Sequence, residues 1–289
     1  MFGKKKAEET PKLENILESL RKNEIVINTH ASVDGSIPER SRFGGRPSVP
    51  RGFEWPRYNG DMANSPLAFL CQIDLSDIVE YDKEELLPKK GMLLFFYELE
   101  SMRWGFDPED KGCARVYYFE NKNALETADF PDDLQEEYRV KEYDLSFSCC
   151  NTYPSFEELE CHSKVECDWE EYDDAIEKFE GRRYNMDVER HKLIGYADIV
   201  QNEMLTECEM TTRGFSSGSP EDYQNASAAE KKDIERSATD WRLLFQMTSI
   251  QDEDYELMFG DCGNLYFYIR KQDLEKRDFS NIWLILQCC

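Results

Sequence analysis

Apolar residues along the chain gather in short runs of strand length. Six runs rich in aliphatic, β-branched and aromatic residues recur, separated by polar segments that contain glycine, proline or aspartate. They cover residues 67–73, 91–97, 115–119, 243–247, 263–269 and 282–286. The run at 91–97 is apolar throughout, which is typical of a strand covered on both faces. The pattern predicts a mainly β fold.

Helical spacing of apolar residues is limited to a few segments. Two sets each share one face of a helix: Leu13, Ile16, Leu17 and Leu20 near the beginning, and Trp169, Tyr172, Ile176 and Phe179 in the middle. Asp168 is suited to cap the second helix. Ser155 with Glu158, and the pair Ser219-Pro220, are typical of two further helix starts. We therefore expect helices at the periphery of the strands, an α+β arrangement.

Two parts of the chain repeat one pattern. Gln72 lies near the end of a strand-like run that resembles the run around Gln246, and a glycine-led strand follows each, at Gly91 and Gly263. The spacings from glutamine to glycine are similar, 91 − 72 = 19 and 263 − 246 = 17 residues. Such internal similarity indicates two related halves.

The repeat sets the expected organisation of the chain. A fainter likeness between residues 43–47 and 193–197 extends it upstream. We expect one domain over residues 1–289, made of an N-terminal helix and lead-in (1–39), a first β half (40–120), an acidic helical insertion (120–190) and a second β half (190–289).

The chain is strongly acidic. It has 60 Asp and Glu against 35 Lys and Arg among 289 residues, a formal net charge of −25. Residues 120–180 hold 20 acidic and 5 basic residues, so −15 of that charge lies in the expected insertion. This balance disfavours binding to nucleic acid or to an anionic membrane surface. With 40% hydrophobic and 13% aromatic residues, the chain is nonetheless expected to fold.

The sequence also predicts a cytoplasmic protein. Its beginning, Met1 to Lys6, is basic but is followed by no apolar stretch, so it does not resemble a signal peptide. No apolar run approaches the ~20 residues that a membrane-spanning helix needs. We expect the ten cysteines to be reduced thiols.

A series of motifs, in order from about residue 40 to the end, resembles the YwqG-like family. The motifs include Phe43-Gly-Gly with Trp55-Pro56 after it, Leu67-Ala-Phe-Leu-x-Gln72, Gly91-x-Leu-x-Phe-Phe96, His191-x-Leu-x-Gly-Tyr196, Trp241-x-Leu-Leu-x-Gln246 and Gly260-Asp-x-Gly-x-Leu-Tyr-Phe267. The resemblance implies a mainly β, roll-like fold of unknown function, found mainly in bacteria. It implies no reaction and no catalytic residue. The chain departs from the family pattern at Ala197, where proline is common.

No motif in the sequence identifies an enzymatic reaction. Cys161, His162 and Cys167 suggest zinc, but their spacing is not that of paired Cys-x-x-Cys ligands, so we expect no metal. A nucleophilic cysteine or serine would need a histidine base, and a structural role explains His191 more simply. We expect no cofactor and no catalytic residue, and the sequence favours a protein that is not an enzyme without deciding the question.

The candidates for a ligand site are polar residues of the repeated strands, an arginine-rich loop and a turn: Arg42, Arg46, Arg51, Gln72, Gln246 and Asp261. The arginines, with Arg57, either hold an anionic ligand or pair with the protein's own carboxylates, and self-pairing is favoured in so acidic a chain. Each glutamine amide can instead satisfy a backbone donor and acceptor. Asp261 lies in a Gly-Asp-Cys-Gly sequence that is typical of a turn.

Three functional hypotheses follow. The first is a non-catalytic binding module whose acidic helical face engages a basic protein partner, for example as an immunity- or antitoxin-like inhibitor. The second is a small-ligand or enzymatic site in a cleft between the two β halves. The third is that the charge serves only to keep the protein in solution.

Overall fold

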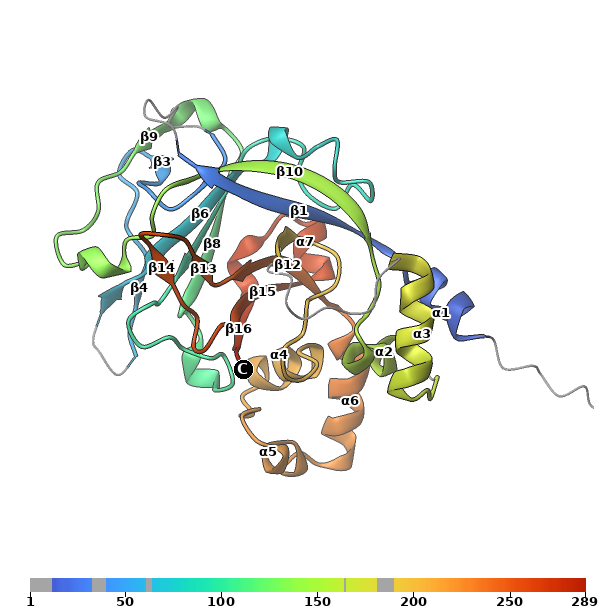
Figure 1. The fold of residues 1–289 in the computed structure, drawn as a ribbon. Helices are drawn as coiled ribbons and strands as arrows, with labels where there is room; N and C mark the ends of the chain where they lie inside the picture. Colours follow the sequence, from blue (N-terminus) through green and yellow to red (C-terminus); the bar gives the residue numbers. More distant parts are fainter. Residues whose placement is uncertain (1–11, 33–39, 61–63, 164, 181–189) are drawn as a thin grey trace, which may run out of the picture.

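One strongly curved antiparallel sheet of ten strands forms the body of the protein and nearly closes into a barrel (Figure 1). The computed structural model describes residues 12–32, 40–60, 64–163, 165–180 and 190–289. Helices lie outside the sheet and at one end of it. This architecture confirms the predicted mainly β, α+β fold with peripheral helices.

The elements have the following bounds. Across the sheet the strands are, in order, β16 (Ile282–Gln287), β15 (Asn264–Arg270), β12 (Trp241–Thr248), β11 (His191–Leu193), β1 (Lys22–Ala31), β10 (Tyr143–Thr152), β2 (Arg42–Phe43), β6 (Ala68–Asp74), β7 (Met92–Tyr97) and β8 (Ala114–Phe119). Separate two-stranded ladders pair β3 (Ser48–Pro50) with β9 (Leu125–Thr127), β4 (Arg57–Tyr58) with β5 (Ser65–Pro66), and β13 (Ile250–Gln251) with β14 (Glu256–Leu257). The α-helices are α1 (Leu13–Leu20), α2 (Phe156–His162), α3 (Trp169–Glu180), α4 (Leu205–Thr212), α5 (Pro220–Gln224), α6 (Ala228–Ala238) and α7 (Lys271–Glu275). Short 3-10 helices are η1 (Leu75–Asp77), η2 (Pro108–Asp110), η3 (Lys122–Ala124), η4 (Glu136–Tyr138) and η5 (Phe279–Asn281).

The elements predicted from apolar spacing are present. The six strand-like runs form β6, β7, β8, β12, β15 and β16, and the two helical faces belong to α1 and α3. The Asp168 carboxylate accepts a hydrogen bond from the backbone N–H of Glu171 (2.9 Å) at the start of α3, as the cap prediction requires. Ser155 caps α2, and Ser219 forms a capping box with Asp222 before α5. Residues 1–11 and 33–39 of the expected lead-in lie outside the described part of the chain.

Two four-stranded meanders on opposite sides of the sheet repeat one another. β2, β6, β7 and β8 are adjacent in chain order on one side, and β11, β12, β15 and β16 on the other. Each meander has an irregularity in its register at the same place, at Leu70 in β6 and at Leu244 in β12. Left-handed backbone angles follow β2 at Gly44 (φ 56°) and follow β11 at Ile194 (φ 53°). The similarity of the two meanders therefore includes a register irregularity and a left-handed backbone angle.

β1 and β10 join the two meanders and pair with each other over ten residues (Figure 1). β1 precedes the first meander in the chain but pairs with β11 of the second, and β10 precedes the second meander but pairs with β2 of the first. Ile25 lies opposite Leu193 as Tyr143 lies opposite Phe43. We call β1, β2, β6, β7 and β8 the first repeat and β10, β11, β12, β15 and β16 the second repeat. The first strand of each repeat therefore pairs with strands of the other repeat: β1 pairs with β11, and β10 pairs with β2.

Strands β1 and β10 were not predicted from the sequence. β10 lies within residues 120–190, where a helical insertion was expected, and the helices of that segment are α2 and α3. In β10, Tyr143, Leu145 and Phe147 alternate with polar residues, and Leu145 and Phe147 are less exposed than the serines that follow them. Such a half-exposed strand has too few apolar residues to stand out as a continuous run. β1 resembles it, since its apolar run is limited to 25–27.

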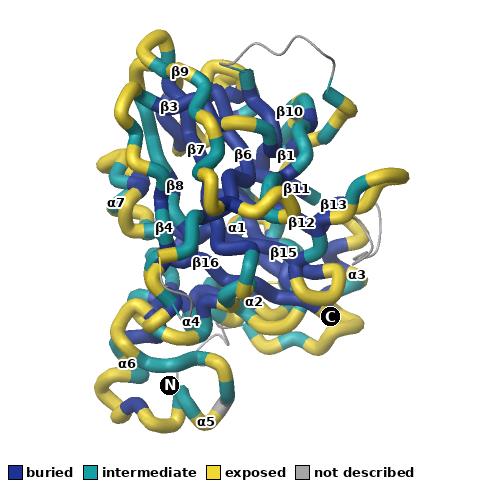
Figure 2. The backbone as a smooth tube through the Cα atoms, turned by 90° about the vertical axis from the view of Figure 1, so that its left-hand side faces the viewer, coloured by how far each residue is buried: buried dark blue, intermediate teal, exposed yellow. Residues whose placement is uncertain are grey.

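Aromatic side chains from both repeats fill the interior of the sheet. The ring centroid of Phe95 in β7 lies 4.5 Å from that of Phe245 in β12 and 5.3 Å from that of Phe267 in β15. All three side chains are fully buried. Figure 2 shows this buried interior running along the strands, with exposed residues concentrated in loops and helices. The two repeats therefore meet in a packed core.

The longest helical segments come from two long connections, both in the second repeat. Residues 153–190 link β10 to β11, whereas only residues 32–41 link β1 to β2. Residues 194–240 link β11 to β12, whereas residues 44–67 link β2 to β6. The first connection forms α2 and α3, and the second forms α4, α5 and α6. In the described ranges, no helix is both long and apolar enough to cross a membrane.

Candidate functional site

Gln72 bonds to backbone groups of its own repeat. Its side-chain oxygen accepts a hydrogen bond from the backbone N–H of Ser48 (2.9 Å), and its amide nitrogen donates to the carbonyl of Arg40 (2.8 Å). The side chain is fully buried. Gln72 therefore ties the segments before and after β2 to strand β6.

Gln246 makes the equivalent bonds in the second repeat. Its oxygen accepts from the backbone N–H of Asp198 (2.9 Å), and its amide nitrogen donates to the carbonyl of Arg190 (3.0 Å) and to the carboxylate of Asp198 (2.9 Å). The correspondence makes Arg40 equivalent to Arg190 and Ser48 equivalent to Asp198. These contacts agree with the structural role that amide chemistry suggests for both glutamines.

Apolar replacement of either glutamine tests that role. In Gln72→Leu or Gln246→Leu, a buried backbone N–H and a carbonyl lose their partners, so we expect each variant to lower the free energy of unfolding by about 2–3 kcal/mol. Urea denaturation measures the change. Gln251→Leu at an exposed position is the control and should stay within about 0.5 kcal/mol. Equal stability of all three variants would contradict the role.

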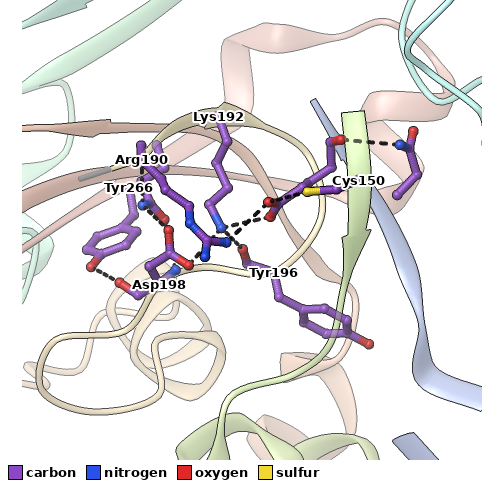
Figure 3. A network of polar contacts seen from close by, with 9 residues as sticks. Cys150, Arg190, Lys192, Tyr196, Asp198 and Tyr266 are labelled. Carbon is purple, nitrogen blue, oxygen red and sulfur yellow. Dashed lines mark hydrogen bonds and ion pairs between the residues drawn. The ribbon is translucent and has the colours of Figure 1, made fainter. Parts of the chain in front are cut away.

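A buried charge network lies next to Gln246 (Figure 3). The Lys192 ammonium donates to the carboxylates of Glu24 (2.9 Å) and Asp198 (2.9 Å) and to the carbonyl of Tyr196 (3.0 Å). Lys192 and Glu24 are fully buried. Burial alone would lower the pKa of Lys192, but the two carboxylates raise it overall. The lysine is thus held charged, with each of its three donors used.

Glu24 connects this network to two further groups. Its carboxylate accepts a hydrogen bond from the Cys150 thiol (3.1 Å), and Arg190 lies 3.5 Å from it. Burial, together with the charge of Glu24, raises the pKa of Cys150 to about 12. The Cys150 thiol therefore stays protonated at neutral pH. Because Glu24 lies on β1 and Lys192 lies on β11, the network links β1 of the first repeat to β11 of the second repeat.

The first repeat has a more open counterpart of this network. The register makes Glu142 equivalent to Glu24 and Arg42 equivalent to Lys192. Arg42 is buried and lies 3.9 Å from Glu142, whose side chain keeps 27% of its surface exposed, and it also bonds to the carbonyl of Arg46. Burial lowers the pKa of Arg42 to about 10.

The other arginines of the loop face carboxylates of the acidic segment. Arg46 lies 2.7 Å from Asp129, Arg51 lies 3.7 Å from Glu126, and Arg57 makes two bonds to Asp133 (2.7 and 2.9 Å). Each of these three arginines therefore lies beside a carboxylate of the protein itself, as the self-pairing alternative requires. The β3–β9 ladder places the two segments side by side. Part of the −15 charge is thus balanced by the body of the protein.

The six candidate ligand residues do not share one location. Arg42 lies opposite Gln72 across β2 and β6, and Arg46 follows in the same loop. In the sheet order, four strands lie between β6 and the β12 strand that carries Gln246. Asp261 is exposed in the turn before β15, where its carbonyl accepts from the N–H of Cys289 (3.1 Å). A small pocket between residues 75 and 89 includes none of the six.

His191 and His162 have structural surroundings. The Nδ1 atom of His191 accepts a hydrogen bond from the backbone N–H of Thr248 (3.2 Å), and burial lowers the pKa of His191 to about 4. The Nε2 atom of His162 lies 2.8 Å from Glu158, one turn earlier in α2. Within the described ranges, no three or more His, Cys, Asp and Glu side chains are arranged to hold a metal ion.

The remaining acidic charge gathers on α2 and α3. Between residues 157 and 180 the sequence has 11 acidic and 2 basic residues, a balance of −9. We call the exposed acids of this segment the acidic face: Glu157, Glu160, Glu166, Asp168, Glu170, Glu171, Asp174 and Glu177. Beneath it, Leu17 of α1 packs with Tyr172 and Ile176 of α3. The helices therefore rest on a core of their own and turn their charge outward.

Comparison with known proteins places this structure in a family. A family model described as a domain of unknown function, DUF1963, matches residues 41–288. The chain belongs to the DUF1963 family. Both meanders of the DUF1963 chain lie within the match, whereas β1 precedes it. No curated protein matches the chain.

The charged core of this DUF1963 protein was not predicted from its sequence. Lys192 and Glu24 are 168 positions apart, and neither belongs to a motif that suggests burial. A usable signal was the internal repeat itself, because aligning 43–47 with 193–197 places Lys192 against Arg42. A basic residue at the same position of both repeats indicates a shared structural role.

Proposed function

We propose that the chain is a cytoplasmic, non-catalytic binding module whose acidic face on α2 and α3 engages a basic protein partner. Within the DUF1963 family we assign it to the YwqG-like proteins, which are mainly bacterial. The observation that supports this function is the placement of the acidic face. It lies in a connection of the second repeat that is 38 residues long (153–190), whereas the first repeat makes the equivalent connection with 10 residues (32–41).

Charge and packing favour recognition over mere solubility. An added connection that served only to keep the protein in solution would not need a packed core, yet α1, α2 and α3 share one that includes Leu17, Leu159 and Ile176. A folded acidic surface attracts a basic partner over distances of several ångströms and accelerates the encounter. An immunity- or antitoxin-like inhibitor of a basic protein is one concrete form of this function.

Neutralising the acidic face tests the proposal. The variant carries five replacements: Glu157→Gln, Glu160→Gln, Glu166→Gln, Glu170→Gln and Asp174→Asn. The control carries five elsewhere on the exposed surface: Glu54→Gln, Glu80→Gln, Asp132→Asn, Glu136→Gln and Glu253→Gln. Both change the net charge equally. In affinity capture from cell lysate at low salt, we expect the wild type and the control to retain a basic protein and the first variant to lose it at least tenfold.

The capture experiment also has contradicting outcomes. Recovery of no basic protein by the wild type would overturn the proposal, and so would equal losses in the two variants. Raising the ionic strength to about 0.5 M should release a partner that is held by charge, because the Debye length then falls to only a few ångströms.

The alternative is a small-ligand or enzymatic site that uses Arg42, Arg46, Arg51, Gln72, Gln246 and Asp261. One observation favours an anionic ligand at the arginines: the side chains of Arg46 and Arg51 keep 54% and 90% of their surface exposed although each faces a carboxylate. Exposed ion pairs are weak and can open for another anion. Titration with inorganic phosphate, followed by amide NMR shifts in residues 42–57, tests this alternative.

A further inference from the structure

Three cysteines meet at one end of the pair of strands β15 and β16. Cys262 lies in the turn before β15, and Cys288 and Cys289 follow β16. The two strands are antiparallel, with Asn264 opposite Gln287, so the beginning of β15 lies beside the end of β16. Each of the three cysteines is a free thiol.

A backbone hydrogen bond brings Cys262 and Cys289 together. The N–H of Cys289 donates to the carbonyl of Asp261 (3.1 Å), and that carbonyl belongs to the peptide bond between Asp261 and Cys262. Covalent bond lengths therefore keep the Cα atoms of the two cysteines within about 7 Å of each other. Disulfides join residues whose Cα atoms are about 4–7 Å apart. The backbone thus already holds these two cysteines near the separation that a disulfide needs.

Exposure distinguishes Cys289 from its neighbour Cys288. Cys262 and Cys289 are exposed, whereas Cys288 is buried in the same core as Leu284 and Leu286. Side chains alternate between the two faces of a strand, so Cys289 continues β16 on the face opposite Cys288. The Cys288 thiol also lies against Gly260, where an added Cβ atom would come within 2.7 Å of its sulfur. A dissolved oxidant therefore reaches Cys262 and Cys289 before it reaches Cys288.

The other exposed cysteine in the described ranges has different surroundings. Cys150 lies on β10, and its thiol donates a hydrogen bond to Glu24 (3.1 Å). Thiol exchange requires the thiolate form, which the raised pKa of Cys150 makes scarce at neutral pH. Exposure and proximity thus coincide at Cys262 and Cys289.

We propose that Cys262 and Cys289 are a redox modification site, which closes into a reversible disulfide by exchange with a low-molecular-weight disulfide of the glutathione class. The first protein thiolate attacks that disulfide, forms a mixed disulfide and releases one glutathione. The second protein thiolate attacks the protein sulfur of the mixed disulfide and releases the other glutathione. Two protein thiols are oxidised and one disulfide is reduced to two thiols, which receive the two protons.

The disulfide would act on the edge of the sheet. β16 is the outermost strand on its side, and the bond would fasten the residues after it to the turn before β15. It closes a loop that spans 289 − 262 = 27 positions. Such a link restricts the unfolded chain, so the oxidised protein should be the more stable form. The stability of this edge would then depend on the thiol redox state, independently of any partner at the acidic face.

Oxidation of the full chain tests the proposal. Dilute protein is incubated with glutathione disulfide at about pH 8, where thiolates are more abundant. Remaining thiols are alkylated, and the peptides are mapped by mass spectrometry. We expect a peptide that links Cys262 to Cys289 within one chain. The Tm should rise by about 3–6 °C, and dithiothreitol should reverse the change.

Serine variants assign the shift in Tm. Cys262→Ser and Cys289→Ser should each abolish it and leave glutathione bound to the remaining cysteine of the pair. Cys150→Ser is the matched control, because it removes an exposed thiol elsewhere and should keep both the link and the shift. A link from Cys262 to Cys288 would overturn the proposal, as would links only between chains or mixed disulfides that never close. If a serine variant does not fold, the peptide map of the wild type decides.

Discussion

Replacing Lys192 by methionine is expected to lower the free energy of unfolding by about 3–5 kcal/mol, because it removes the nearest counter-charge of a buried carboxylate. Glu24 is fully buried and would keep only its contacts with Cys150 and Arg190. Asp198, which is partly exposed, loses less. Methionine has nearly the length of lysine, so the variant removes the charge without leaving a large cavity. Urea denaturation at pH 7 measures the change.

Two further variants make the Lys192 result specific. Lys192→Met combined with Glu24→Gln removes both charges of the fully buried pair and should recover part of the loss. Arg46→Met removes a surface ion pair and should change stability by less than about 1 kcal/mol. A loss in Lys192→Met no larger than in Arg46→Met would show that the network does not hold β1 against β11.

The first repeat offers a comparison within the same chain. Arg42 occupies the position equivalent to Lys192, but its partner Glu142 is partly exposed and can be solvated when the arginine is lost. Both networks thus pair a buried basic residue with a glutamate at equivalent positions, but the glutamate is fully buried only in the second repeat. Such a difference agrees with the placement of helix α4, which packs against β12 and β16 of the second repeat. Within the described ranges, no α-helix lies between the strands of the first repeat.

Local sequence patterns predicted the parts of the fold that depend on local burial. Runs such as 91–97 and 263–269 are apolar because both faces of these strands are covered, and that property is visible in the sequence alone. Gln72 and Gln246 indicated two similar halves because each makes the same kind of amide contacts with the backbone. β1 and β10 were not predicted because they are half-exposed and have few apolar residues in a row. Their pairing with strands of the other repeat is a long-range contact that no local pattern encodes.

The candidate site was predicted less completely, because its contacts are long-range. The sequence indicated that the arginine loop would pair internally, but it could not name Asp129, which is 83 positions from Arg46. The sequence placed much of the acidic charge in residues 120–180, but it did not show that these acids form two groups with different surroundings. Glu126 and Asp133 serve the arginine loop, whereas the acids of α2 and α3 face outward. That division depends on β10, which separates the two parts.

Glu207 on α4 is a partly buried acid whose ionisation should affect stability. Burial, with a smaller contribution from the nearby Glu203, raises the pKa of Glu207 from 4.5 to about 9. Its Oε2 atom is buried and has no hydrogen-bond partner among the described residues. The folded chain therefore holds this proton between about pH 4.5 and 9, whereas the unfolded chain releases it above about pH 4.5.

Glu207→Met should therefore stabilise the protein at neutral pH. Over that window the free energy of unfolding of the wild type falls as pH rises, by up to about 1.4 kcal/mol per pH unit from this group. The decrease begins near pH 4.5 and ends near pH 9, above which both states are ionised. Discounting for partial solvation, we expect Glu207→Met to be more stable than the wild type by about 2–3 kcal/mol at pH 7. The difference should grow from pH 5 to pH 9 when measured by urea denaturation. Glu207→Gln should reproduce the pH trend, and Glu80→Gln on the surface should not; a constant difference across this range would rule out Glu207 as its source.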